Sequence, residues 1–257
     1  MAKSGQARVL TDQQQAHLFD VIRHHRHPEK NTAIMQISFK LGLRAQEIAL
    51  LQIKEVARLS GNGDSYRLNE IMSLPAAYTK GADAMGRSQH EYVRRSISFD
   101  VQTFDNVVRQ IASLAKSGTE INPADFYPPA KKHKGRSRDL PLVDSALRRA
   151  LTDYLDLRLE KAGGRLSPSA PLFISQKGGP YSPNTLAEHM GMMLKDWAGV
   201  EKASSHSGRR SVITNVIHKQ GKSLKVAQKI AGHVNPSTTI IYEDPPEEQI
   251  SDALKDL

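Results

Sequence analysis

The chain has 257 residues, no cysteine and a formal net charge of +9, with 36 Lys and Arg against 27 Asp and Glu. The lack of cysteine excludes disulfides, thiolate nucleophiles and Cys-ligated zinc; no apolar run is long enough to span a membrane, and the N-terminal MAKSGQARVL lacks the apolar stretch of a signal peptide. We therefore expect a cytoplasmic protein with a polyanionic partner. Aromatic residues make up only 5%, which favours double-stranded nucleic acid over a single strand whose bases stack on aromatic rings.

The N-terminal part of the chain is predicted to be helical. Residues 11–25 have the pattern of an amphipathic helix with Thr11 as its N-cap. Residues 27–31 (HPEKN) predict a loop, and residues 31–53 predict two helices broken near Gly42. The segments on either side of the turn signal GNGD (61–64) then predict two antiparallel strands that lead into SLPAAYTKG (73–81).

The middle of the chain is polar and basic. We expect a loop over 82–92, a strand over 93–100, a helix over 101–118 that ends in Gly118, and a basic strand over 136–142 (RSRDLPL). The string PAAYTKG (75–81) is loosely echoed by PPAKKHKG (128–135), and each precedes an Arg-containing strand and a helix. Either a local duplication or coincidence would produce this echo.

The remaining elements are predicted as helices. They cover 144–160, 182–199, 206–221, 223–232 and, in the last eleven residues, 247–257. The helices over 206–221 and 223–232 each end in glycine. Apolar residues at helical spacing are expected to form core stripes in three helices: Leu147, Leu151, Leu155 and Leu159; Leu186, Met190, Met193 and Trp197; Ile250, Ala253, Leu254 and Leu257. The predicted fold class is mostly α with a small antiparallel β-sheet (α+β).

A few polar residues could carry chemistry. In HSGRR, His206 and Arg209 are three apart, so on a helix they would share a face and could bind two oxygens of one phosphate. Arg44 interrupts an apolar region three residues before Glu47, which we expect to pair with it. Each feature also has a simpler interpretation as a solvated basic pair or a structural ion pair.

The segment AGHVNPSTTIIYEDPP (231–246) adds His233 and, nine residues later, Tyr242. Alone, they would be interpreted as a capping histidine and a packing tyrosine. Together with two arginines, a second histidine and a lysine they suit phosphoryl transfer by a tyrosine hydroxyl. Guanidinium groups would neutralise the phosphate, and a Lys or His would protonate the leaving oxygen. No dense Asp/Glu cluster suggests a two-metal site, so we expect no metal or other cofactor.

The motifs GLRAQEIALL, TKG, HSGRR, AGH and TTIIY, in this order, resemble those of the tyrosine recombinase (phage integrase-type) catalytic domain from about residue 10 to 245. The resemblance implies that fold. It implies that Arg44 and Arg209 clamp the scissile phosphate, that His206 and His233 hydrogen-bond its oxygens and assist proton transfer, and that Tyr242 forms a 3′-phosphotyrosyl link without metal or ATP.

The family's general-acid lysine lies at a strand turn, and two residues compete for this role. Lys80 follows the two predicted strands directly, as the family's order requires, and we favour it. Lys134 precedes the better match to the third strand, which contains Arg138. The choice of Lys80 makes most of 82–133 an insertion in or after that turn.

We expect residues 1–257 to form a single catalytic domain with an insertion at about 82–133, a tail helix at about 247–257 and no separate N-terminal DNA-binding domain. A catalytic domain alone would bind DNA weakly, need an accessory DNA-binding protein, or use the insertion as a substitute for the N-terminal domain. The tail would either fold back on its own core or, hinged at Pro245-Pro246, dock on a neighbouring subunit of a dimer or tetramer assembled on DNA.

The resemblance implies a site-specific enzyme that integrates, excises or resolves double-stranded DNA, working at the bacterial nucleoid. A type IB topoisomerase or a hairpin telomere resolvase would use the same chemistry. A non-catalytic DNA-binding regulator with the same fold is the alternative from another class, although every catalytic position is filled by a competent residue.

Overall fold

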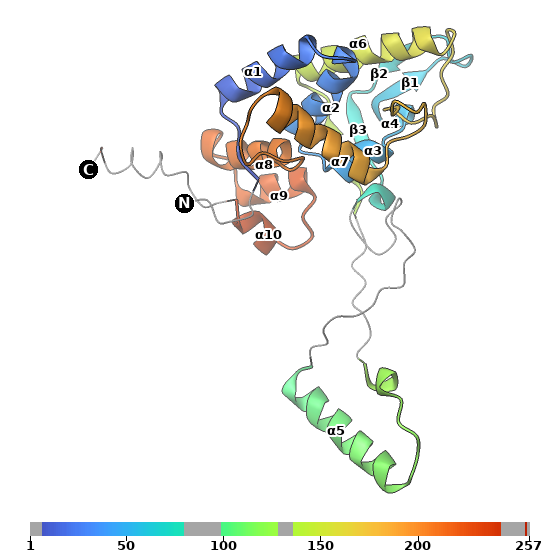
Figure 1. Cartoon of the computed structure of the whole chain (residues 1–257), viewed down its shortest axis with the longest axis vertical. Helices are drawn as coiled ribbons and strands as arrows, with labels where there is room; N and C mark the ends of the chain where they lie inside the picture. The colour runs from blue at the N-terminus through green and yellow to red at the C-terminus, as the bar shows by residue number, and fades with distance from the viewer. Residues whose placement is uncertain (1–6, 80–98, 128–135, 243–254, 256–257) are drawn as a thin grey trace. The chain divides into compact units, whose positions relative to one another are not determined.

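The computed structural model describes residues 7–79, 99–127, 136–242 and 255 (Figure 1). The chain divides into two compact units, Met1–Gly86 with Lys134–Leu257, and Arg87–His133. The second unit falls within the segment that the sequence predicts as an insertion, and the division into domain and insertion stays a prediction.

The first unit contains most of the described elements. Its helices are α1 (Asp12–Arg23), α2 (Pro28–Leu41), α3 (Ala45–Leu50), α4 (Ile53–Val56), α6 (Ser145–Lys161), α7 (Pro183–Met192), α8 (Ser207–Thr214), α9 (Leu224–Ala231) and α10 (Ser237–Ile240). Its strands are β1 (Ala57–Leu59), β2 (Tyr66–Leu68), β3 (Ile71–Leu74) and β4 (Arg138–Pro141). The 3₁₀ turn η1 is Ala76–Tyr78, and the π-helical turns η3 and η4 are Met193–Trp197 and Asn215–Lys219. The second unit contains α5 (Val101–Lys116) and the 3₁₀ turn η2 (Pro123–Phe126).

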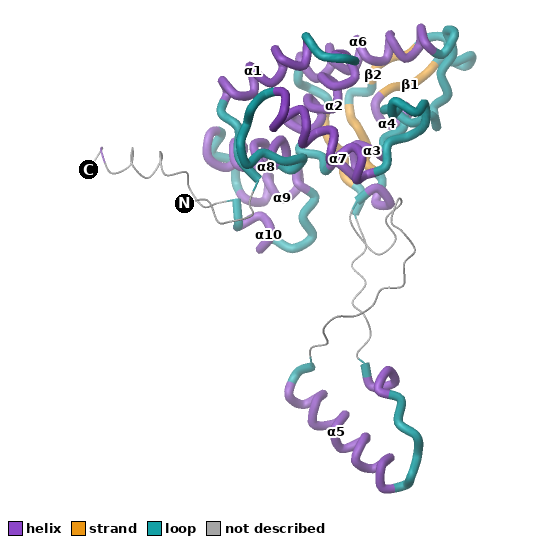
Figure 2. Tube along the Cα trace, viewed as in Figure 1, coloured by secondary structure: helices purple, strands orange, loops and turns teal. Residues whose placement is uncertain are grey.

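The predicted fold class is confirmed: helices dominate, and the described strands pair antiparallel (Figure 2). The strands form two two-stranded sheets instead of one. β1 pairs with β2, and β3 pairs with β4 so that Leu74 lies opposite Arg138. The pairing of β3 with β4 therefore brings together residues more than sixty positions apart.

Most helix predictions are confirmed by local capping chemistry. Thr11 accepts a hydrogen bond from the backbone of Gln14, whose side chain in turn accepts one from the backbone of Thr11. Gly42 ends α2 in the left-handed region, at φ 64°, where the break between two helices was predicted. The helix predicted over 101–118 is present as α5, and Gly118 follows it at φ 67°.

Some predictions are wrong in detail. The loop expected at 27–31 is the first turn of α2, because Pro28 takes the first helical position, where its fixed φ and missing N–H are tolerated. The helix α10 was not predicted, since a single turn gives no periodic pattern. The predicted loop at 82–92, residues 93–98 of the next predicted strand and, apart from residue 255, the tail helix lie outside the described residues.

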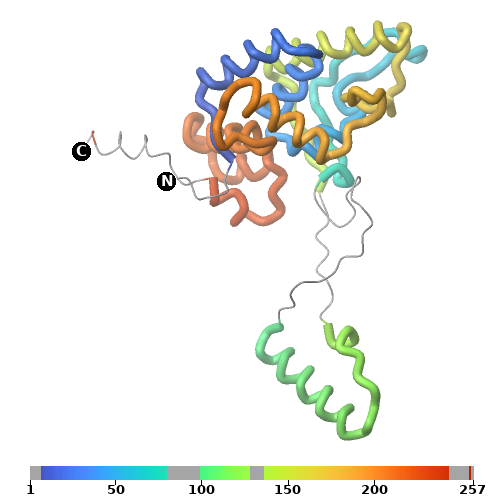
Figure 3. The backbone as a smooth tube through the Cα atoms, in the orientation of Figure 1, coloured from blue at the N-terminus to red at the C-terminus, as the bar shows by residue number. Residues whose placement is uncertain are grey.

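The core of the first unit holds most of two predicted stripes, with Leu159 and Trp197 partly buried at its edge, and the third stripe, in the tail, lies outside the described residues. Leu147, Leu151 and Leu155 of α6 are fully buried, as are Leu186, Met190 and Met193 of α7 and η3. A smaller apolar cluster lies between α8, η4 and α9, and Tyr242 packs against it. Figure 3 shows these C-terminal helices, in orange and red, gathered beside one another. This cluster anchors the C-terminal part of the candidate site.

Candidate active site

Glu47, in the first turn of α3, lies at the centre of a group of arginines. Its side chain is fully buried and accepts hydrogen bonds from the Arg44 backbone N–H at 2.8 Å and from Arg44 Nη1 at 3.0 Å. The predicted Arg44–Glu47 pair is thus confirmed. Burial raises the pKa of Glu47, but Arg138, Arg44 and Arg209 together outweigh burial and hold it below its usual value. The carboxylate is therefore ionised.

Arg138 on β4 is the second partner of Glu47. Its Nη2 donates to Oε2 at 2.8 Å and its Nη1 to Oε1 at 3.2 Å, and its side chain is only 8% exposed. In the sequence, Arg138 marked only a strand, and its place in the site was not predicted. The strand's alternation could have indicated that Arg138 is buried and needs a partner, because Arg138 and buried Leu140 lie on the same face, but it does not identify Glu47 as that partner.

Arg209, the second predicted clamp residue, is held from both sides. Its guanidinium donates to the carbonyl oxygens of Gly42, at the end of α2, and Ala231, at the end of α9. The side chain is buried, and burial followed by repulsion from Arg44 lowers its pKa to about 9. Arg209 therefore stays cationic at neutral pH and ties two helix ends to one point.

Two glycines allow this close packing. Gly208, next to Arg209, lies against Ser38 of α2, and a Cβ at position 208 would collide with Ser38. Gly232 ends α9 at φ 64°, and a Cβ there would collide with the guanidinium of Arg138. The glycines of HSGRR and AGH thus leave the room that the arginines need.

His233 and Tyr242 lie beside the arginine group. Nδ1 of His233 is 2.9 Å from Thr239 Oγ1, and the His233 ring stacks on the Tyr242 ring with centroids 5.8 Å apart. Burial, then the charges of Arg209, Arg44 and Arg138, lower the pKa of His233 to about 3. The imidazole is therefore neutral at physiological pH, and it links the arginines to the phenol.

Tyr242 is half-buried and lies two residues after the end of α10. Its backbone N–H donates to the Thr239 carbonyl at 3.0 Å, and its own carbonyl lies 3.1 Å from His218 Nε2. The Arg210 guanidinium lies 5.7 Å from the centre of its ring. The side chain thus packs against the smaller apolar cluster and also lies near a cation. Its position is compatible with both interpretations from sequence, a packing tyrosine and a phenol placed for phosphoryl transfer.

His206 takes the N-cap position of α8 and is exposed, whereas Arg209, in the first turn, is buried. The two candidate lysines, Lys80 and Lys134, lie outside the described residues. Both belong to the connection between β3, which ends at Leu74, and β4, which begins at Arg138. The choice between them stays a prediction.

The described group of Arg44, Arg138 and Arg209 with Glu47 carries three positive charges against one negative. Such an excess in a largely buried place favours an anion, and guanidinium groups suit the oxygens of a phosphate. The neighbouring phenol could attack a phosphorus atom bound there.

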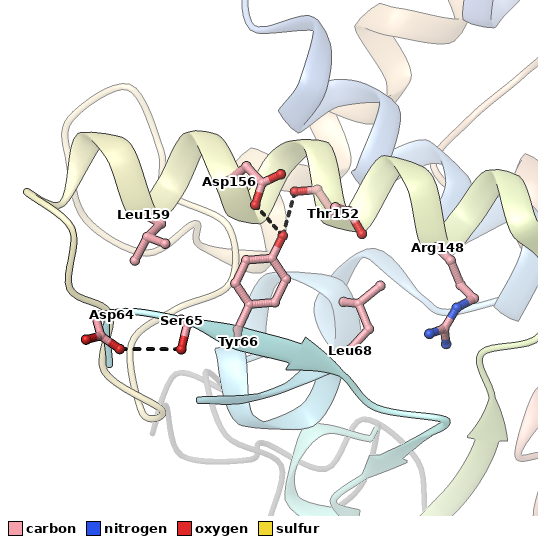
Figure 4. A pocket seen from close by; sticks show the side chains of 8 residues that line it. All are labelled: Asp64, Ser65, Tyr66, Leu68, Arg148, Thr152, Asp156 and Leu159. Atoms are coloured by element: carbon pink, nitrogen blue, oxygen red, sulfur yellow. Dashed lines mark hydrogen bonds between the residues drawn. The ribbon is translucent and has the colours of Figure 1, made fainter. Parts of the chain in front are cut away.

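Other described features do not add to this site. A surface pocket of about 490 Å³ lies between β2 and α6, where Tyr66 donates to Asp156 (Figure 4). None of its lining residues is a predicted site residue. Within the described part of the chain, no helix could span a membrane, and no group of three or more His, Asp or Glu side chains could hold a metal ion.

Known proteins are similar to this chain in sequence and in fold. The model of the Phage integrase family matches residues 101–249, more than half of the chain. Tyrosine recombinase XerC of Methylobacterium sp. (strain 4-46) is 31% identical over 109 residues, which make up 42% of this chain and 32% of that protein. XerC of Herpetosiphon aurantiacus is 29% identical over 156 residues, 58% of this chain and 42% of that protein. The chain thus spans less than half the length of these relatives.

Solved structures extend the likeness over the whole fold. The XerA recombinase superposes with a TM-score of 0.59 at 17% identity, covering 100% of this chain and 65% of that chain. The Tn1549 transposon integrase, in complex with transposon right end DNA, gives 0.56 at 15% identity, covering 100% and 68%. These likenesses confirm the tyrosine recombinase catalytic-domain fold.

Proposed function

Because the chain belongs to the Phage integrase family, we propose that it catalyses site-specific recombination of double-stranded DNA with Tyr242 as the nucleophile. One observation carries the proposal: the Tyr242 ring stacks on His233 beside three arginines, two of which bind a single carboxylate while the third, Arg209, is held by two backbone carbonyls. A buried group with a net positive charge is suited to a phosphodiester, and the formal charge of +9 suits DNA. The Tn1549 integrase, which shares the fold, is seen bound to DNA.

In the proposed reaction, the Tyr242 hydroxyl attacks the scissile phosphorus and the bond from phosphorus to the 5′ oxygen breaks. A 3′-phosphotyrosyl bond forms, and the leaving 5′ oxygen takes a proton from Lys80 or, in the alternative, from Lys134. The phenol proton passes to His233. A bound phosphate would offset the arginine charges that lower the pKa of His233, and so make this imidazole a better base.

Arg44 and Arg209 would neutralise the charge that develops on the phosphate oxygens, and His206 would hydrogen-bond one of them. The half-buried Arg44 is held by Glu47, and Arg209 by two backbone carbonyls, so neither has to reorganise during the reaction. Prepositioned charge of this kind is the main source of transition-state stabilisation in many enzymes. Arg138 would act through Glu47, as a positioning residue.

The phosphotyrosyl bond conserves the energy of the phosphodiester. Attack by a 5′-hydroxyl on this bond reverses the step and rejoins DNA, so the exchange of strands needs neither ATP nor metal. We further propose that two or four copies assemble on DNA to exchange strands, with or without an accessory DNA-binding protein, and that the tail after Tyr242 packs either on its own subunit or on a neighbour.

The experiment starts with duplexes selected by the full chain from a random-sequence library, since the target site is unknown. Each selected duplex is nicked near the site, so that cleavage releases a short strand and traps the covalent intermediate. We expect a protein–DNA adduct that survives denaturing electrophoresis and is lost in Tyr242→Phe, while DNA binding is retained. Binding without an adduct on any selected duplex would make the protein a non-catalytic regulator.

A further inference from the structure

The helix α5 carries an apolar stripe with coiled-coil spacing. Val101, Phe104, Val108, Ile111 and Ala115 follow one another at intervals of three and four residues, the spacing of a and d positions in a heptad. No residue of α5 is buried, and Val101, Phe104 and Val108 are 80%, 53% and 46% exposed. Within its own unit, the stripe therefore lacks the cover that an apolar helix face normally has.

The second unit covers only one edge of this stripe. The residues along that edge and in the segment that follows α5 are half-buried: Val107, Ile111, Leu114, Ile121 and Phe126. The ring of Phe99 lies against that of Phe104, with centroids 6.2 Å apart, yet Phe104 stays largely exposed. A unit of this size rarely supports itself with a single core and is commonly stabilised by association.

The charges of α5 favour an antiparallel copy of itself as the partner. The N-cap Asp100 and Asp105 lie in the first half of the helix and Lys116 is its last residue, whereas Arg109 lies at the middle and faces the middle of the second copy in either orientation. Two copies packed antiparallel place opposite charges and opposite helix dipoles beside each other, whereas parallel copies place like charges together.

The apolar side chains lead to the same arrangement. In an antiparallel pair, a positions face d positions of the second copy, so that Val108 faces Ile111 and the large Phe104 faces the small Ala115. Parallel packing would set Phe104 against Phe104 and Ala115 against Ala115, which overfills one layer and leaves a void in another. A stripe that is complementary to itself is what a two-fold interface requires.

We propose that α5 pairs antiparallel with α5 of a second copy of this chain, and that this pairing joins two copies without DNA. The proposal is independent of the recombinase chemistry, because α5 contains no candidate catalytic residue.

Sedimentation velocity on the full chain, without DNA, tests the pairing. We expect dimers that become monomers in Val108→Glu, because a charge would be buried at the centre of the seam. Ser113→Glu adds the same charge on the opposite, exposed face of α5 and should leave the dimer intact. Circular dichroism would verify that both variants keep their helix. A monomeric parent chain, or equal behaviour of the two variants, would overturn the proposal.

Orientation can be tested by cross-linking, since the chain has no cysteine of its own. Val108→Cys and Ile111→Cys variants, one of them enlarged by a tag, are oxidised separately and as a mixture. Antiparallel pairing predicts a disulfide mainly between the two different variants. Efficient disulfides within each separate variant, with no excess in the mixture, would overturn the antiparallel arrangement. Failure of either test leaves DNA cleavage by Tyr242 unaffected, so the two proposals fail independently.

Discussion

Arg138 donates to both carboxylate oxygens of Glu47, which lies 91 residues earlier in the chain. The same carboxylate holds Arg44, so a strand residue and a proposed phosphate ligand share one buried anion. Gly232, immediately before His233, leaves the room through which the Arg138 side chain passes. Arg138 thus connects the first part of the candidate site to the last.

Arg138→Gln should destabilise the fold and abolish adduct formation. The substitution removes the bidentate partner of a fully buried carboxylate, and breaking a buried pair in this way costs about 3 kcal/mol. Urea unfolding and the nicked-duplex assay provide the two measurements. Arg136→Gln, at an exposed position two residues earlier, is the matched control and should keep the stability of the parent. Equal stability of the two variants would show that the Arg138–Glu47 pair contributes nothing.

Gly232→Ala should cost more stability than Gly221→Ala. Both glycines have positive φ, 64° and 60°, so each substitution carries a backbone penalty of roughly 1–2 kcal/mol. Only at position 232 does the added Cβ meet another group, the Arg138 guanidinium, whereas position 221 is open. The difference between the two free energies of unfolding therefore measures this contact. A difference near zero would contradict the close approach.

Thr239→Val should slow adduct formation about 10-fold, the equivalent of losing one buried hydrogen bond worth about 1.4 kcal/mol. The hydroxyl of Thr239 is the partner of His233 Nδ1, and its loss leaves the imidazole without that partner. Thr239→Ser retains a hydroxyl and should restore most of the rate. Single-turnover rates on the nicked duplex make the comparison. A Thr239→Val rate equal to that of the parent would contradict this role of the hydroxyl.

Stability should fall as the pH is lowered from neutral. Burial, with nearby cations, lowers the pKa of His189 to about 4 and of His233 to about 3. The unfolded chain takes up these protons near pH 6.5, so between that pH and the folded pKa values it binds more protons than the folded chain. The stabilisation is complete above about pH 6.5, and about 2 kcal/mol per histidine is lost by pH 5.

Urea unfolding of His189→Gln at pH 7 and pH 5 isolates one of these contributions. The variant should lose about 2 kcal/mol less than the parent between the two pH values. His17→Gln, at an exposed position of α1, should lose as much as the parent. If His189→Gln behaves like His17→Gln, the buried imidazole is not the source of the pH dependence.

The sequence was informative where structure depends on near neighbours. The cap at Thr11, the break at Gly42 and the buried stripe through Met190 follow from residue type and local spacing, and the structure has all three. The Arg44–Glu47 pair was predictable for the same reason, because its members are three residues apart.

The relationships that depend on the three-dimensional fold were not predictable in this way. No local pattern indicates that Arg138 reaches Glu47, since β4 meets β3 only after a connection of more than sixty residues. The partnership of His233 with Thr239 depends on the single helical turn of α10, which is too short to produce periodicity. The roles of Lys80 and Lys134 stay predictions, because both residues belong to the long connection and lie outside the described residues.

Mass spectrometry of the trapped adduct tests the central claim most directly. Trypsin would release residues 230–255, between Lys229 and Lys255, and this peptide contains one tyrosine, Tyr242, together with several serines and threonines. After nuclease trimming, we expect the mass of a 3′-nucleotide on Tyr242. A nucleotide on any other residue, such as Ser237, or a covalent adduct that persists in Tyr242→Phe, would contradict the assignment of the nucleophile.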